Sequence, residues 1–214
     1  MLSKPSFTPH PPHEGMRKQP QQERALRTVK TIFEATARIL EQEGEAALNT
    51  NKIARTAGFS VGTLYQYFPT KEAILDALAE RERRRMLAEL QVDLDRAVHE
   101  RIHPKVLLRE RIRALNQAFG SGKLLNRPLM RLLWTLDHHD SIAQVQRESA
   151  ERLAIAMAQL NHPELRKGNP AMFFLATRAV IGAMRSASLE DSPLLGTAEF
   201  EDELTRMVWG LIAE

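Results

Sequence analysis

The sequence contains no cysteine at any of its 214 positions. This absence excludes a disulfide framework, a thiolate metal site and a cysteine nucleophile, and it fits a reducing cytoplasm. Long apolar runs are also missing, because the richest stretch, residues 171–184, is interrupted by Arg178 and is too short to span a membrane. No apolar core follows a basic start at the N-terminus, so we expect no secretory signal. These absences predict a cytoplasmic protein that does not enter a membrane.

The common motifs of catalysis and nucleotide binding are missing as well. The sequence has no G-x-S-x-G nucleophile elbow, no P-loop and no G-x-G-x-x-G fingerprint. His99 and His103 lie four residues apart and could hold zinc, with further ligands from Glu100, His138 or His139. No third ligand is evident near the pair, so we expect no metal, no cofactor and no enzyme activity.

Composition permits a polyanionic partner without requiring one. The net charge is +3, and 43% of the residues are hydrophobic, as in ordinary globular proteins. The charge is uneven, because residues 17–71 hold nine basic and five acidic side chains. The N-terminal third is therefore more basic than the rest.

Residues 50–71 combine two short helices with a glycine between them, in the run TNKIARTAGFSVGTLYQYFPTK. Thr50 is expected to cap the first helix with its hydroxyl group. Gly58 supplies the left-handed residue that ends this helix, and Ser60 caps a second helix over residues 61–68. Two helices joined through a glycine turn are typical of a helix-turn-helix that reads DNA.

The second short helix leaves an outer face that suits a DNA groove. Leu64 and Phe68 lie one turn apart and form its buried side. Gly62 keeps the backbone bare, so the start of the helix can approach a groove floor closely. The outer side chains that can hydrogen-bond base edges are Thr63 and Gln66. Those that can reach phosphate oxygens are Tyr65, Tyr67 and Lys71. A solvated surface turn with two packing tyrosines is the alternative.

The run TNKIARTAGFSVGTLYQYFPTKEAIL resembles the DNA-binding core of the TetR/AcrR family of bacterial transcriptional regulators. The likeness includes the Ala-Gly turn, the Gly-Thr-Leu-Tyr helix start and the Tyr-Phe-x-Thr-Lys-Glu exit, and it covers about residues 28–78. The resemblance implies phosphate contacts from Thr50, Tyr65, Tyr67 and Lys71. It implies base or groove-floor contacts from Ser60, Val61, Gly62, Thr63 and Gln66.

Helical periodicity continues through the chain and predicts an all-α fold of about nine helices. The predicted domains are a disordered, proline-rich tail (1–24), a three-helix DNA-binding head (25–70) and a larger regulatory and dimerisation domain (71–214). The head begins with a helix over about 27–43. A long helix from Lys71 to about His99, capped by Thr70, links the two domains. Later helices are expected near 104–119, 127–138, 140–160, 170–189 and 197–213.

The last two helices have faces suited to a symmetric dimer. One carries small residues that allow close approach, and the other carries an apolar stripe. The resemblance implies a four-helix homodimer interface, with the candidates Ala176, Ala179, Ala183, Ala187, Leu204, Met207, Val208 and Leu211. Such a dimer would place two recognition helices in successive major grooves, about 34 Å apart, on a palindromic operator.

The helices between the head and this pair could enclose a small-molecule pocket. The bulky candidates for its lining are Met86, Phe119, Met130, Leu133, Trp134 and Phe173. Ordinary core packing is the alternative for each of them. The resemblance implies that an inducer here would shift the long helix and change the separation of the heads, provided that it binds the DNA-incompetent state more tightly.

Together these features predict a dimeric transcriptional repressor that a small hydrophobic ligand releases from duplex DNA. Two alternatives remain open. One is a DNA-binding regulator with a protein partner or with no effector. The other is an enzyme or metal carrier that merely contains a helix-turn-helix.

Overall fold

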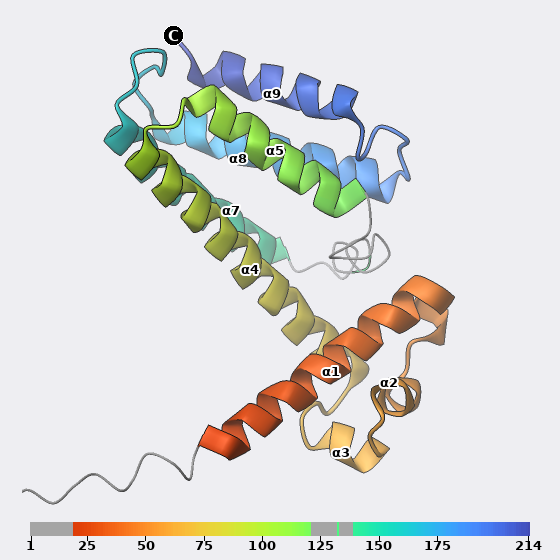
Figure 1. Cartoon of the computed structure of the whole chain (residues 1–214). Helices are drawn as coiled ribbons and strands as arrows, with labels where there is room; N and C mark the ends of the chain where they lie inside the picture. Colours follow the sequence, from red (N-terminus) through yellow and green to blue (C-terminus); the bar gives the residue numbers. More distant parts are fainter. Residues whose placement is uncertain (1–18, 121–131, 133–138) are drawn as a thin grey trace, which may run out of the picture.

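Every regular element of the part described by this computed structural model is helical (Figure 1). The structure describes residues 19–120, 132 and 139–214. Its elements are α1 (Gln19–Glu43), the 3-10 helix η1 (Glu45–Ala47), α2 (Thr50–Ala57), α3 (Val61–Tyr65), α4 (Lys71–Glu100), α5 (Pro104–Gly120), α7 (His139–Leu160), α8 (Pro170–Leu189) and α9 (Ala198–Ile212). These residues form no strand; their β pairing is one isolated antiparallel bridge between Leu165 and Ala213. The all-α prediction is confirmed.

The first helix is longer than its apolar stripe suggested. α1 begins at Gln19, so residues 19–24 of the predicted tail are helical, and the predicted start near residue 27 was too late. The stripe itself is buried as predicted, with Ile32 and Leu40 almost fully enclosed. Gly44 follows the helix at a φ of 77°, where a side chain would be strained.

The core of the head is completed by the start of the long helix. Ile32 of α1, Ile53 of α2 and Leu64 of α3 are fully buried, and Ile74 and Leu78 of α4 belong to the same apolar cluster. A three-helix unit of this size has little core of its own. The first two turns of α4 therefore contribute apolar side chains to the core that encloses the head.

α4 is the mechanical link between the head and the C-terminal domain. Thr70 caps it as predicted, because the Thr70 hydroxyl accepts a 3.1 Å hydrogen bond from the backbone N–H of Ala73. The 30 residues of this helix correspond to a length of about 45 Å. Figure 1 shows α4 running from the head to the far end of the C-terminal domain, with α7 alongside it.

The C-terminal helices agree closely with the predicted ranges. α5, α7, α8 and α9 each begin and end within one residue of the prediction. The helix predicted over 127–138 lies outside the described residues except for Leu132. α5 packs against α9 and α8, and α7 packs against α4 and α8. No helix in the described ranges combines the length and apolar content needed to cross a membrane.

An ion-pair cluster lies on α4 where this helix contacts α1. Glu82 is buried, and its carboxylate lies 2.8 Å from Arg81 and 2.9 Å from Arg85. The Arg81 guanidinium also lies 5.0 Å from the centre of the Phe33 ring of α1, within cation–π range. Glu82 therefore faces inward near this contact, and its buried charge is balanced by both arginines.

Candidate functional site

The helix-turn-helix starts one residue earlier than predicted. Asn49, and not Thr50, is the N-cap of α2, because the Asn49 Oδ1 atom accepts a 2.9 Å hydrogen bond from the backbone N–H of Lys52. Thr50 is the first residue of the helix instead. Gly58 ends the helix in the left-handed region at a φ of 76°, as predicted.

The second short helix has the predicted cap but a shorter length. The Ser60 hydroxyl accepts a 3.1 Å hydrogen bond from the backbone N–H of Thr63. α3 ends at Tyr65, three residues before the predicted end, and the chain then continues as turns. Leu64 and Phe68 are both buried, so the two predicted inward positions are confirmed.

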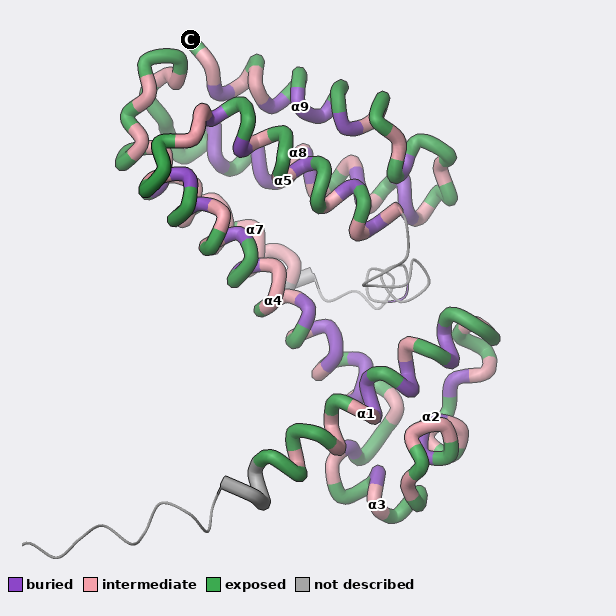
Figure 2. Tube along the Cα trace, in the orientation of Figure 1, coloured by how far each residue is buried: buried purple, intermediate pink, exposed green. Residues whose placement is uncertain are grey.

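The predicted DNA-contacting residues divide into an exposed group and a partly buried group. Figure 2 shows α3 exposed along most of its length at the edge of the head. The exposed group is Ser60, Val61, Gly62, Tyr65 and Gln66. The partly buried group is Thr50, Thr63, Tyr67 and Lys71. Tyr67 packs against the apolar core.

One polar contact joins the two helices of the motif at this surface. The hydroxyl groups of Thr50 and Tyr65 lie 3.2 Å apart, within hydrogen-bonding distance. Half of Tyr65 is exposed. The Lys71 ammonium group lies 3.8 Å from Glu72, which is a loose and solvated ion pair. The edge therefore presents hydroxyl, amide and ammonium groups without a tightly bound counter-charge on Lys71.

A cavity of about 160 Å³ lies among α4, α5, α7, α8 and α9. Two of the predicted lining residues, Met86 and Phe173, do line it. Phe119 is 2% exposed and belongs to the apolar core instead. The other three candidates, Met130, Leu133 and Trp134, lie outside the described residues.

Two charged residues that were not predicted, Asp93 and Arg111, also line this cavity. Arg111 of α5 lies in its wall, 3.4 Å from Asp93 of α4, and it donates a 3.2 Å hydrogen bond to the backbone oxygen of Met86. Burial lowers the pKa of Arg111, and the negative charges of Asp93 and Glu89 oppose that shift. A signal was present, because Arg111 interrupts the inward apolar stripe of α5, in which Leu107, Leu108, Ile112 and Leu115 also line the cavity.

The predicted dimer residues are also of two kinds. Ala176 and Ala187 of α8 and Leu204 and Val208 of α9 are buried within the chain, where they join its apolar core. Ala179, Ala183 and Leu211 are half-buried, and 47% of Met207 is exposed. Only the second set leaves surface for another molecule.

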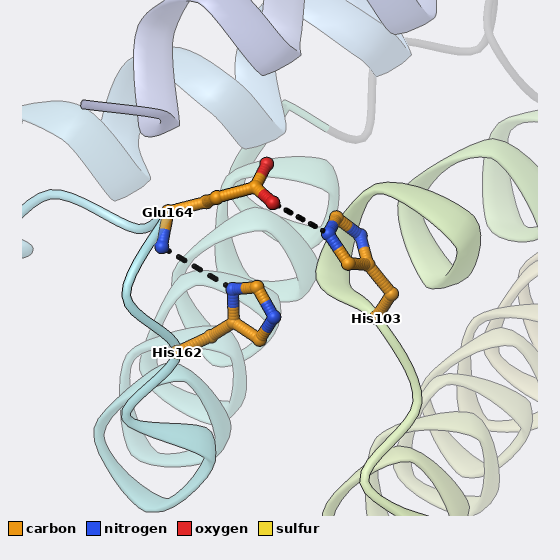
Figure 3. A group of neighbouring side chains, drawn as sticks. All are labelled: His103, His162 and Glu164. Carbon is orange, nitrogen blue, oxygen red and sulfur yellow. Dashed lines mark hydrogen bonds and ion pairs between the residues drawn. The ribbon is translucent and has the colours of Figure 1, made fainter.

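A group of potential metal ligands joins two turns at the far end of the C-terminal domain (Figure 3). His103, His162 and Glu164 each offer an atom within 4.8 Å of the others. The group includes His103 but not His99, because the chain leaves the helix between them. His103 Nε2 lies 3.1 Å from Glu164 Oε1, and this hydrogen bond lowers the pKa of Glu164.

In both imidazole rings of this group, Nδ1 accepts a hydrogen bond from a backbone N–H. His103 Nδ1 accepts a hydrogen bond from the N–H of Lys105, and His162 Nδ1 accepts one from the N–H of Glu164. A neutral imidazole whose Nδ1 accepts carries its proton on Nε2. Metal coordination through Nε2 would move that proton to Nδ1 and break these bonds. The observed arrangement therefore suits a hydrogen-bonded contact between the two turns better than a metal site.

Comparison with known proteins agrees with the helix-turn-helix geometry. Residues 32–78 match a sequence model described as bacterial regulatory proteins, tetR family. An HTH-type transcriptional regulator of Mycobacterium tuberculosis is 40% identical over 63 residues, which are 29% of this chain and 31% of that relative. This chain thus spans about a third of the length of the first curated relatives that it matches.

Longer but more distant matches extend into the C-terminal domain. The repressor KstR of Mycobacterium tuberculosis is 30% identical over 131 residues, which are 60% of this chain and 58% of KstR. The crystal structure of FadR from Bacillus subtilis with stearoyl-CoA aligns at a TM-score of 0.64 and 17% identity, over 86% of this chain and 98% of FadR. The helix-turn-helix segment over residues 32–78 therefore matches the tetR family of bacterial regulatory proteins, and the chain shares its overall fold with a solved transcriptional regulator.

Proposed function

We propose that the chain is a sequence-specific DNA-binding transcriptional repressor. The observation that carries this proposal is the outer edge of the helix-turn-helix, where Gly62, Tyr65 and Gln66 are exposed. Gln66 can form paired hydrogen bonds with adenine, and the tyrosine hydroxyl suits a phosphate oxygen. A bare glycine at the second residue of α3 lets the helix approach the bases between these contacts.

The repressor acts as a homodimer that binds a palindromic operator. The surface proposed for the seam is the part of α8 and α9 that the protomer leaves open, around Ala179, Ala183, Met207 and Leu211. Gly182 and Gly210 lie on the same two helices, and an added Cβ at either position would meet no atom within 4 Å. A second copy can therefore approach these helices closely. Its two heads then bind successive major grooves on one face of the duplex.

A small, mainly apolar ligand in the cavity releases the protein from DNA. The support is geometric, because α4 both lines the cavity through Met86 and Leu90 and completes the core of the head through Ile74 and Leu78. A ligand that favours one position of α4 therefore also favours one position of the head. KstR, a relative, is named a repressor, and the FadR structure holds stearoyl-CoA.

The experiment is selection of bound sites from a pool of random duplexes by the full chain. The expected result is one enriched motif with two-fold symmetry, whose half-sites are about one helical turn apart. A triple variant at Tyr65, Gln66 and Lys71, each changed to alanine, serves as the control and should enrich nothing above background. If the chain and this variant enriched the same sequences to the same extent, the proposal would be wrong. Release of the selected duplex by ligands then tests the repressor mechanism separately.

A further inference from the structure

The cavity wall is mainly apolar, with three neutral polar residues (Gln146, Ser149 and Thr177) and one charge-balanced pair. Of the described residues that line it, Asp93 and Arg111 are the charged ones, and they lie 3.4 Å apart on α4 and α5. The Arg111 side chain is 16% exposed and that of Asp93 is 33% exposed. Placing two charges in such a wall is costly, so the pair determines which ligands the cavity accepts.

The balance of charge disfavours an ionic ligand of either sign. A carboxylate that approached Arg111 would also approach Asp93, and Glu89 adds negative charge nearby. An ammonium group that approached Asp93 would meet Arg111. In both cases the ligand loses its hydration and gains only a partly compensated contact. A neutral polar group avoids this cost.

The pair also offers hydrogen bonds of both kinds. The bonds to Asp93 and to the backbone oxygen of Met86 use two of the five N–H groups of the guanidinium. Arg111 can therefore donate to a further acceptor. The bond from Arg111 reaches Oδ2 of Asp93, so Oδ1 can accept from a ligand. A hydroxyl group matches the pair, because it donates and accepts at the same atom.

The volume sets the size of the apolar part. At about 160 Å³, the cavity is close to the ~150 Å³ engineered cavity that binds benzene. We propose that the effector of this chain is a neutral molecule with about one six-membered ring and one hydroxyl group, which accepts from Arg111 and donates to Asp93. This inference rests on the proposed function, in which the cavity is the effector site.

Such a ligand would connect α4 and α5, the two helices through which binding would act on release from DNA. Asp93 lies on α4, which carries the head, and Arg111 lies on α5, which packs on α8 and α9. The hydroxyl would therefore bridge the moving helix to the part of the domain that holds the proposed dimer seam. Toluene would fill the same part of the cavity but has no hydroxyl group to bond to Asp93 and Arg111.

The test uses benzyl alcohol, benzoate, benzylamine and toluene, which share a ring and differ in the polar group. Their dissociation constants for the full chain are measured by calorimetry or ligand NMR at pH 7. Benzyl alcohol should bind best, with benzoate and benzylamine each weaker by about tenfold. Equal affinity for the three polar ligands, or a preference for either ion, would overturn the inference.

Two substitutions should reverse the preference in opposite directions. Asp93→Asn leaves Arg111 without its carboxylate, so benzoate should become the best ligand. Arg111→Met leaves Asp93 unpaired, so benzylamine should become the best ligand. Arg109→Met removes a guanidinium from the same helix outside the cavity and should keep the original order. A common order in all four proteins would contradict the role of the pair.

The ligand class and the DNA-binding function can be distinguished by their outcomes. If none of the four compounds binds the chain, a ring-sized effector is wrong. DNA-site selection with the same samples still reports whether the chain is a sequence-specific repressor. If the compounds bind with the predicted order but leave the selected duplex bound, the ligand class stands and the release mechanism fails.

Discussion

Gly62→Ala should separate the stability of the head from its ability to bind DNA. Gly62 is the second residue of α3 and is exposed, and a Cβ added there would come no closer than 3.8 Å to any neighbour, the Ser60 hydroxyl. The folded head therefore has room for a methyl group. Alanine also favours a helix over glycine by up to about 1 kcal/mol, and by less at a helix start. The substitution should raise the free energy of unfolding by roughly 0.5 kcal/mol.

In the proposed complex with DNA, the alanine methyl group would lie between α3 and the floor of the groove. It would push α3 outward and weaken the base contacts of Gln66, each worth about 1–3 kcal/mol. Both heads of a dimer are affected, so affinity for the selected duplex should fall by at least about tenfold. A stabilised protein with a weakened function is the expected result.

Urea denaturation and fluorescence anisotropy with the selected duplex measure the two quantities. With a urea slope of about 1–3 kcal/mol per molar, the unfolding midpoint should rise by roughly 0.2–0.5 M. Gln159→Ala, on the exposed face of α7, is the control and should change neither measurement. If Gly62→Ala bound the duplex as tightly as the unchanged chain, close approach of α3 to the bases would be refuted.

Four further substitutions test separate parts of the account. Lys71→Ala should weaken specific and nonspecific DNA binding together and lower the slope of log affinity against log salt by roughly one; an unchanged slope would remove its phosphate contact. Gln66→Ala should alter preference at one or two base pairs in a repeated selection, and an identical motif would exclude base reading. Asn49→Ala should cost about 1 kcal/mol of unfolding free energy in urea, whereas no loss would contradict its capping role. Glu164→Gln should destabilise the chain at pH 7, because the hydrogen bond from His103 lowers the pKa of Glu164. That contribution is present above the ordinary carboxyl pKa of 4.5 and is lost as the pH falls through the lowered value, so the two stability curves should converge in acid.

Local signals explain why most helix boundaries could be predicted. Ser60 and Thr70 each have a hydroxyl at the right distance from a backbone N–H three residues later, and both caps are present. Pro104 and Pro170 mark the first residues of α5 and α8, where a missing N–H costs nothing. The start of α2 failed because Asn49 and Thr50 are adjacent residues that can both cap, and sequence spacing does not choose between them.

The remaining features depend on contacts between distant segments. Leu204 and Val208 form an apolar stripe whether another helix of the same chain covers it or a second copy does, and their burial required the structure. Arg111 and Asp93 lie 18 residues apart, and His103 and Glu164 lie 61 residues apart. Periodicity places each of these residues on a face of its own helix or turn. It does not show which other segment of the chain that face contacts.

The absence of cysteine allows a direct test of where the head lies on DNA. Gln66→Cys introduces a single thiol, to which an iron chelate that cleaves nearby DNA can be attached. We expect cleavage of the selected duplex at two short clusters, symmetric about the centre of the site and about one helical turn apart. Glu203→Cys, at an exposed position of α9, carries the same chelate as the control and should give background cleavage only. Equal cleavage from positions 66 and 203 would contradict the claim that the outer edge of α3 enters the groove.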